Sequence, residues 1–168
     1  MGLREFFLWQ LEHESETTRK VIARVPEGRN SWKPHERSME LGHLAALVAS
    51  MPGWVETMVN RAELNLSDPA NELMQTKAVK TRAELCQMLA EGLAKSRKAL
   101  ESTTEDDLMK MWRFRMHGKV VSEGPRYAMI ADGAMTHMAH HRGQLTVYLR
   151  LLDQKVPAIY GPSADERF

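Results

Sequence analysis

The sequence predicts an all-α fold, a four-helix bundle with one long crossover connection. Apolar residues recur every three or four positions in four separate segments, which is typical of amphipathic helices. Each segment spans roughly 20–28 residues, a length that suits a bundle. Only one stretch alternates with the period of two that is typical of strands. Nothing divides the chain, and we expect a single domain over residues 1–168.

The first two helices are predicted on either side of a proline-containing loop. An apolar stripe predicts the first helix over residues 3–25, and Pro26 ends it. The second helix is expected to begin after Ser38, a favourable N-cap residue, and to fade near Arg61. Pro52 lies inside this helix, where it should kink the helix or shift its hydrogen bonds.

The third helix follows a long connection. Residues 65–79 read as a loop with space for one helical turn. Thr81 and Glu84 are spaced as a capping box, because each side chain can accept a hydrogen bond from the other residue's backbone N–H. The sequence therefore predicts the third helix over residues 82–102.

A short non-helical segment is predicted before the fourth helix. Over residues 111–124 apolar side chains alternate with charged ones around Gly118, which indicates a short β-hairpin or an extended excursion. Pro125 suits the first position of the fourth helix, which should run to about Asp153.

Composition excludes several classes of protein. The net charge of +1 gives no basic surplus for nucleic-acid binding. No apolar run reaches the length of a membrane span, and the N-terminus does not resemble a signal peptide. The single cysteine, Cys86, permits no internal disulfide and no cysteine-rich metal site, which fits a cytoplasmic protein.

Three of the seven histidines lie close together in the fourth helix. On a helical wheel with about 100° per residue and His137 at zero, the apolar face centres near 50–60°. His141 then lies near 40° and His140 near −60° by the same arithmetic. His137 and His141 should therefore share the inward face one turn apart, while His140 faces solvent or a neighbouring chain.

Two interpretations of this pair stand side by side. Both histidines could be core residues satisfied by hydrogen bonds. Alternatively, two histidines at i and i+4 can bind one metal ion, and His43 lies on the predicted apolar stripe of the second helix as a candidate third ligand. The residue after His137 is Met138 rather than Glu, so the general base of a zinc protease is missing.

Small residues interrupt two of the apolar stripes. Ser15 and Thr18 do so in the first helix, and Gly92 and Ser96 do so in the third. A glycine inside a helix costs about 1 kcal/mol relative to alanine, so Gly92 should have a compensating role. It permits either close helix packing or a cavity beside the metal, lined from the first and third helices.

Two stretches together resemble the DinB-like family, which is named for a damage-inducible bacterial protein. They are WKPHERSMELGHLAALVA, residues 32–49, and HMAHHRGQLTVYLR, residues 137–150, with a Val-Pro pair after them. The family includes YfiT-type metal-dependent hydrolases and bacillithiol S-transferases. The resemblance covers nearly the whole chain and implies a four-helix bundle, a homodimer, and a divalent metal ion held by His43, His137 and His141. It further implies that Arg142 and Gln144 surround that site.

The resemblance implies zinc or nickel most directly, with manganese as another metal of the family. Its first functional implication is a transferase that activates a low-molecular-weight thiol on the ion. A metal-dependent hydrolase is the alternative enzyme. A metal- or small-ligand-binding stress-response protein is the non-catalytic alternative. A structural site is usually closed by four ligands, so a fourth ligand such as His117 would favour that last reading. Glu40 could orient a ligand or cap its helix.

Overall fold

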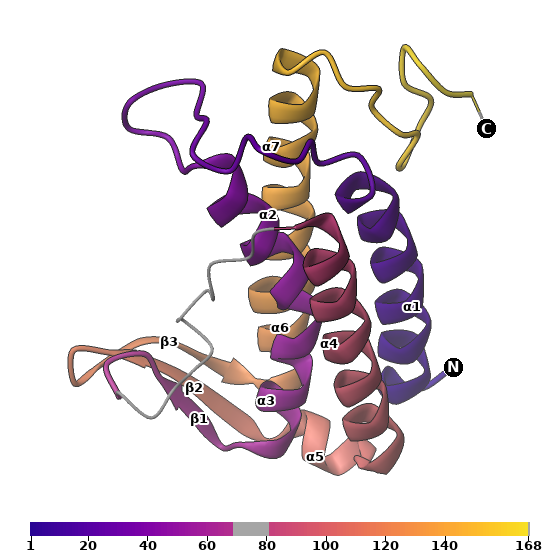
Figure 1. The fold of residues 1–168 in the computed structure, drawn as a ribbon. Coiled ribbons are helices and arrows are strands. Elements are labelled where there is room, and N and C mark those ends of the chain that lie inside the picture. The colour runs from indigo at the N-terminus through magenta and orange to yellow at the C-terminus, as the bar shows by residue number, and fades with distance from the viewer. Residues whose placement is uncertain (69–80, 168) are drawn as a thin grey trace.

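The computed structural model describes residues 1–68 and 81–167, and its architecture is predominantly helical with a small sheet at one end (Figure 1). Long helical segments lie side by side, and a hairpin projects from one end (Figure 1). Within the described residues, no helix combines the length and the apolar character that a membrane crossing requires. The predicted loop at 65–79 lies largely outside the described residues.

Each predicted helix is present, and two of them are divided. The helical elements are α1 (Leu3–Ile22), α2 (Leu41–Ser50), the 3₁₀ segment η1 (Met51–Gly53), α3 (Trp54–Asn60), α4 (Arg82–Ser102), α5 (Glu105–Met109), α6 (Arg126–Ile130), the π-helix η3 (Ala131–Thr136) and α7 (His137–Leu151). The predicted capping box of α4 is confirmed, with Thr81 and Glu84 bonded reciprocally.

The predicted N-cap of the second helix is wrong. Glu40, not Ser38, is the N-cap residue of α2, and its side chain makes no capping hydrogen bond. The first amides of this helix are satisfied instead by the preceding loop. The Leu41 N–H donates to the carbonyl of Trp32 over 2.8 Å, and the Gly42 N–H donates to the carbonyl of Asn30 over 2.9 Å. A side-chain cap is therefore unnecessary here.

Within residues 1–68 and 81–167 the sheet has three strands, so it extends beyond the predicted hairpin. β2 (Met111–Met116) pairs antiparallel with β3 (Lys119–Pro125), which confirms the hairpin, with its turn at His117 and Gly118. β1 (Glu63–Asn65) adds in parallel to β2, with Leu64 opposite Phe114. Only the hairpin has the alternation that predicts strands, because β1 is three residues long.

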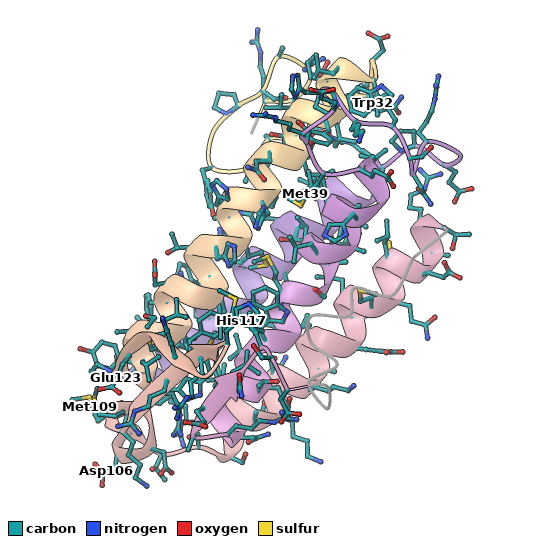
Figure 2. All side chains as sticks on the ribbon, turned by 90° about the vertical axis from the view of Figure 1, so that its left-hand side faces the viewer. Trp32, Met39, Asp106, Met109, His117 and Glu123 are labelled. Atoms are coloured by element: carbon teal, nitrogen blue, oxygen red, sulfur yellow. The ribbon has the colours of Figure 1, made fainter. Side chains whose placement is uncertain are left out.

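In the part of the chain that the structure describes, two apolar clusters fill the interior. One contains Trp112, Met58 and Ile130 near the sheet, and the other contains Leu44 and Leu145 between α2 and α7. Figure 2 shows the two ends: Trp32 and Met39 lie at one, and Asp106 and Met109 lie at the other. The paired histidines lie on α7, whose residues contribute to both clusters.

Pro52 converts one turn of the second helix to 3₁₀ geometry, as its position predicts. Ser96 of α4 stabilises this break, because its hydroxyl donates to the Pro52 carbonyl over 2.6 Å and accepts from the Glu56 N–H over 3.0 Å. Gly92 lies against Gly53, and a Cβ atom built on Gly92 would be 2.9 Å from the Gly53 nitrogen. Close packing therefore explains Gly92 and Ser96, and the alternative of a cavity at these residues is wrong.

Gly92→Ala should destabilise the protein, although alanine favours helices by about 1 kcal/mol. The added methyl group would meet Gly53 backbone at 2.9 Å, and overpacking of this kind typically costs about 1–3 kcal/mol. Urea denaturation followed by circular dichroism measures the change. Gly143→Ala in α7 is the matched control, because a Cβ there meets nothing within 4 Å. An equally stable or more stable Gly92→Ala variant would contradict the packing argument.

Candidate functional site

His137 and His141 face each other on α7, as the helical wheel predicts. Their Nε2 atoms are 2.9 Å apart and their ring centroids 4.7 Å apart. His141 is 9% exposed, whereas His137 is exposed. The expectation that both lie on the buried face is therefore correct for His141 and wrong for His137. His140 is exposed, as predicted, and its ring meets that of His141 in a T-shaped arrangement, with centroids 4.9 Å apart.

Gln144 determines which nitrogen of His141 carries the proton. The amide oxygen of Gln144 lies 2.8 Å from Nδ1 of His141. A carbonyl oxygen only accepts hydrogen bonds, so Nδ1 carries the hydrogen and Nε2 keeps its lone pair. That lone pair points at His137, which donates from its own Nε2. The tautomer that Gln144 selects is the one that a metal ligand binding through Nε2 requires.

The surroundings of His141 favour the neutral ring. Burial lowers the pKa of His141, and the hydrogen bond to Gln144 opposes that effect. The nearby His137, His140 and His43 lower the pKa further, because a positive charge on any of them would repel the imidazolium. A neutral imidazole is the form that binds metal ions, so this environment reduces the competition of protons with a metal ion at His141.

His43 comes from α2, which packs against α7. It acts electrostatically on His141, but its side chain is exposed, so its predicted place on the core stripe is wrong. The buried face of α2 instead centres on Leu44, Ala45 and Val48. The 3₁₀ segment at Pro52 also breaks the regular phase that the predicted stripe assumes.

The histidine pair has the spacing that one metal ion would need. Two nitrogens, each about 2.0–2.1 Å from an ion and about 90–110° apart, are separated by about 2.8–3.4 Å. The observed 2.9 Å falls in this range. Over residues 1–68 and 81–167, no three His, Cys, Asp or Glu side chains are grouped closely enough to hold an ion. The structure thus assembles two of the three predicted residues, and His43 lies on the adjacent helix.

A cavity of about 240 Å³ opens beside His137. Its walls are mainly apolar and come from α3, from the sheet, and from the successive helical segments α6, η3 and α7. They include three aromatic rings, those of Trp54, Trp112 and Phe114. The Trp54 ring meets His137 edge to face, with centroids 5.7 Å apart. One alternative that the sequence left open was a cavity beside the metal, lined from the first and third helices, whereas this cavity is lined by neither α1 nor α4.

Asp132 lies in the same cavity wall as His137 and was missed by sequence reasoning. In an unbroken α-helix two residues five positions apart point about 140° away from each other. The π-helix Ala131–Thr136 widens the turn, as the bond from Thr136 Oγ1 to the Ala131 carbonyl at 3.0 Å illustrates. Its i to i+5 spacing brings Asp132 onto the side of His137. No sequence pattern marks this segment.

Arg142, the neighbour of His141, is buried and holds α7 against α1. It is 1% exposed and forms an ion pair with Glu14 at 2.6 Å. It also donates to the Thr18 hydroxyl over 3.1 Å, which explains why a polar residue interrupts the stripe of α1. Tyr160, from the C-terminal tail, donates to the same carboxylate at 2.8 and 2.9 Å. Burial raises the pKa of Tyr160, so the hydroxyl remains a donor.

The two other candidate residues lie apart from the histidine pair. His117 occupies the hairpin turn, where its backbone N–H donates to Ser67 Oγ over 2.6 Å (Figure 2 labels it). The side chain of His117 is exposed and its nearest described partner is the same serine. Glu40 is exposed at the start of α2 and makes no capping bond.

Comparison with known proteins agrees with the fold. YrdA, an uncharacterized protein of Bacillus subtilis, is 22% identical over 162 residues, which is 96% of this chain and 90% of YrdA. The crystal structure of the DinB-like protein YjoA from Bacillus subtilis matches with a TM-score of 0.64 at 20% identity, over 89% of this chain and 94% of YjoA. A DinB-like protein from Bacillus cereus matches with a TM-score of 0.68 at 19% identity, over 93% and 97% of the two chains.

The protein is predominantly helical and has a small sheet. Its candidate site is built around the paired histidines of α7. The DinB family model matches residues 2–167, and the chain belongs to the DinB family.

Metal-free protein should lose stability as the pH falls below about 6.5, the ordinary pKa of histidine. The pKa of folded His141 is lowered from 6.5. Below that value the unfolded chain binds a proton that the folded chain does not, so stability rises with pH through this window and then levels off. Urea denaturation between about pH 5 and pH 8 in a chelating buffer measures this dependence. His141→Gln should flatten the profile, and an unchanged profile would disprove the assignment.

Proposed function

We propose that this protein binds a divalent metal ion through His137, His141 and His43 and uses it to activate a low-molecular-weight thiol for transfer to an electrophile. Zinc or nickel suits the imidazole ligands best, and manganese is the third candidate. We propose further that the helices form the four-helix bundle of the DinB-like family and that the protein assembles as a homodimer.

The observation that carries the proposal is the arrangement of His137, His141 and Gln144. The two Nε2 atoms are 2.9 Å apart, and Gln144 keeps Nε2 of His141 unprotonated, so its lone pair would turn from the hydrogen bond with His137 to a bound ion. A hydrogen-bonded pair of core histidines would need neither the exposure of His137 nor a cavity beside it. His43 is exposed, so its side chain can turn toward the pair without disturbing the core.

A divalent ion at these residues would lower the pKa of a bound thiol or water. The chain itself would supply the proton acceptor, since Asp132 lines the same cavity as His137. The S–H proton would pass to the Asp132 carboxylate. The sulfur would form a bond to the electrophilic carbon, and the leaving group would depart with the electron pair of the broken bond.

Hydrolysis is the second candidate, and Asp132 is the observation that favours it. A carboxylate beside the site can accept a proton from water as readily as from a thiol. A non-catalytic metal- or ligand-binding stress protein is the third. A structural ion is usually closed in by four protein ligands. The exposed His137 and the adjoining cavity instead favour an open, reactive position.

Metal analysis tests the site. Protein purified without chelators should carry close to one zinc or nickel ion per chain, and His137→Ala and His43→Ala should lose most of it. His140→Ala is the matched control, because His140 is exposed on the same helix and outside the proposed ligand set. Elemental analysis by mass spectrometry gives the content. Equal metal content in wild type and both ligand variants would refute the three-histidine site.

The same measurement can test Gln144. Gln144→Leu keeps every proposed ligand and removes the acceptor that fixes the His141 tautomer. Loss of such an outer hydrogen bond typically weakens metal binding about 10–100-fold. Competition with a chromogenic chelator measures the affinity. An unchanged affinity would show that Gln144 does not orient His141.

Turnover tests the reaction. Metal-loaded protein should accelerate the reaction of small thiols with 1-chloro-2,4-dinitrobenzene beyond the rate of free metal plus thiol, releasing chloride. Asp132→Asn should lower kcat by about 10²-fold, the usual contribution of a positioned proton acceptor, while its metal content stays at the wild-type level. Absence of acceleration with every thiol would reject S-transfer, and hydrolysis of activated esters would then support the second candidate.

A further inference from the structure

Aromatic and thioether side chains make up much of the lining of the cavity beside His137. Trp54, Trp112 and Phe114 supply three aromatic rings, and Met58 and Met129 supply two thioethers. Flat aromatic ligands gain from such walls, because rings stack or meet edge to face and sulfur contacts ring edges favourably. Saturated ligands of equal size gain only from burial. The composition of the walls therefore favours an aromatic occupant.

The size and polarity of the cavity define the occupant further. Its volume of about 240 Å³ exceeds the roughly 150 Å³ of an engineered cavity that binds benzene, so one or two fused rings fit. Asp132 lies in its wall and would repel an anionic group.

We infer that this cavity binds an uncharged, planar aromatic group of one or two rings and holds it beside His137. As a binding site the cavity stands on its own residues. The further step, that the electrophilic substrate of the thiol lies in this cavity, rests on the proposed function. With that step, the cavity assigns the substrate to the aromatic class.

Titration calorimetry with 2-naphthol tests the site in a chelating buffer, so that a failure of metal binding cannot affect the result. Wild-type protein should bind 2-naphthol and show quenched tryptophan fluorescence, because two indoles form the walls. Two related probes test the chemistry. The anion 2-naphthoate and the saturated decahydro-2-naphthol should each bind at least about fivefold more weakly.

Two substitutions on β3 test the location. Ser122 lines the cavity, so Ser122→Phe should fill it and weaken 2-naphthol binding at least about tenfold. Val121 is the neighbouring exposed residue outside the cavity, and Val121→Phe should change the affinity by less than about twofold.

Three results would overturn the inference. They are the absence of 2-naphthol binding up to its solubility limit, an unchanged affinity in Ser122→Phe, and binding of the anion or the saturated ring as tight as that of 2-naphthol. Naphthol binding, together with a lack of metal in protein purified without chelators, would leave the inference standing and refute the proposed function alone.

Discussion

The buried ion pair between Arg142 and Glu14 fixes the orientation of α7, on which the candidate site depends. Arg142 is 1% exposed and bonds to the Glu14 carboxylate, the Glu14 carbonyl and Thr18, all on α1. Breaking such a buried pair typically costs about 3–5 kcal/mol. Adjacent residues of an α-helix point about 100° apart. Holding Arg142 toward α1 therefore also fixes the direction of His141, which directly precedes it. The inward place of one histidine is therefore set by its charged neighbour.

Much of the fold follows from local patterns that can be recognised in the sequence. The capping box at Thr81 and Glu84, the break at Pro52 and the alternation before Pro125 all indicate the elements that are found. Each of these signals acts within a few residues. The strand β1 could not be predicted in this way, because its three residues form a strand only by pairing with β2.

The positions of the site residues could be predicted where the last helix is a regular α-helix, but not where its winding changes to a π-helix. Within α7 the wheel places His141 inward and His140 outward, as observed. It fails for Asp132, because the π-helix adds residues to one turn and no composition marks it. It also fails for His43, since α2 is apolar around most of its circumference and one stripe does not identify its buried face. A helical wheel assumes a constant turn per residue. The π-helix departs from that turn, and the mostly apolar sequence of α2 does not determine which of its faces is buried.

The π-helix has a consequence for how this protein can vary. Asp132 and His137 share one cavity wall only because the turn between them is wider than an α-helical turn. A segment of the same length wound as a regular α-helix would place Asp132 about 140° from His137, and the carboxylate would leave the wall that both residues now share. If one residue were also removed, the two would be four positions apart, about 40° from each other, and would stay on one face. The winding of this segment and its number of residues are therefore linked, so a change in one without the other alters the site more than an ordinary substitution does.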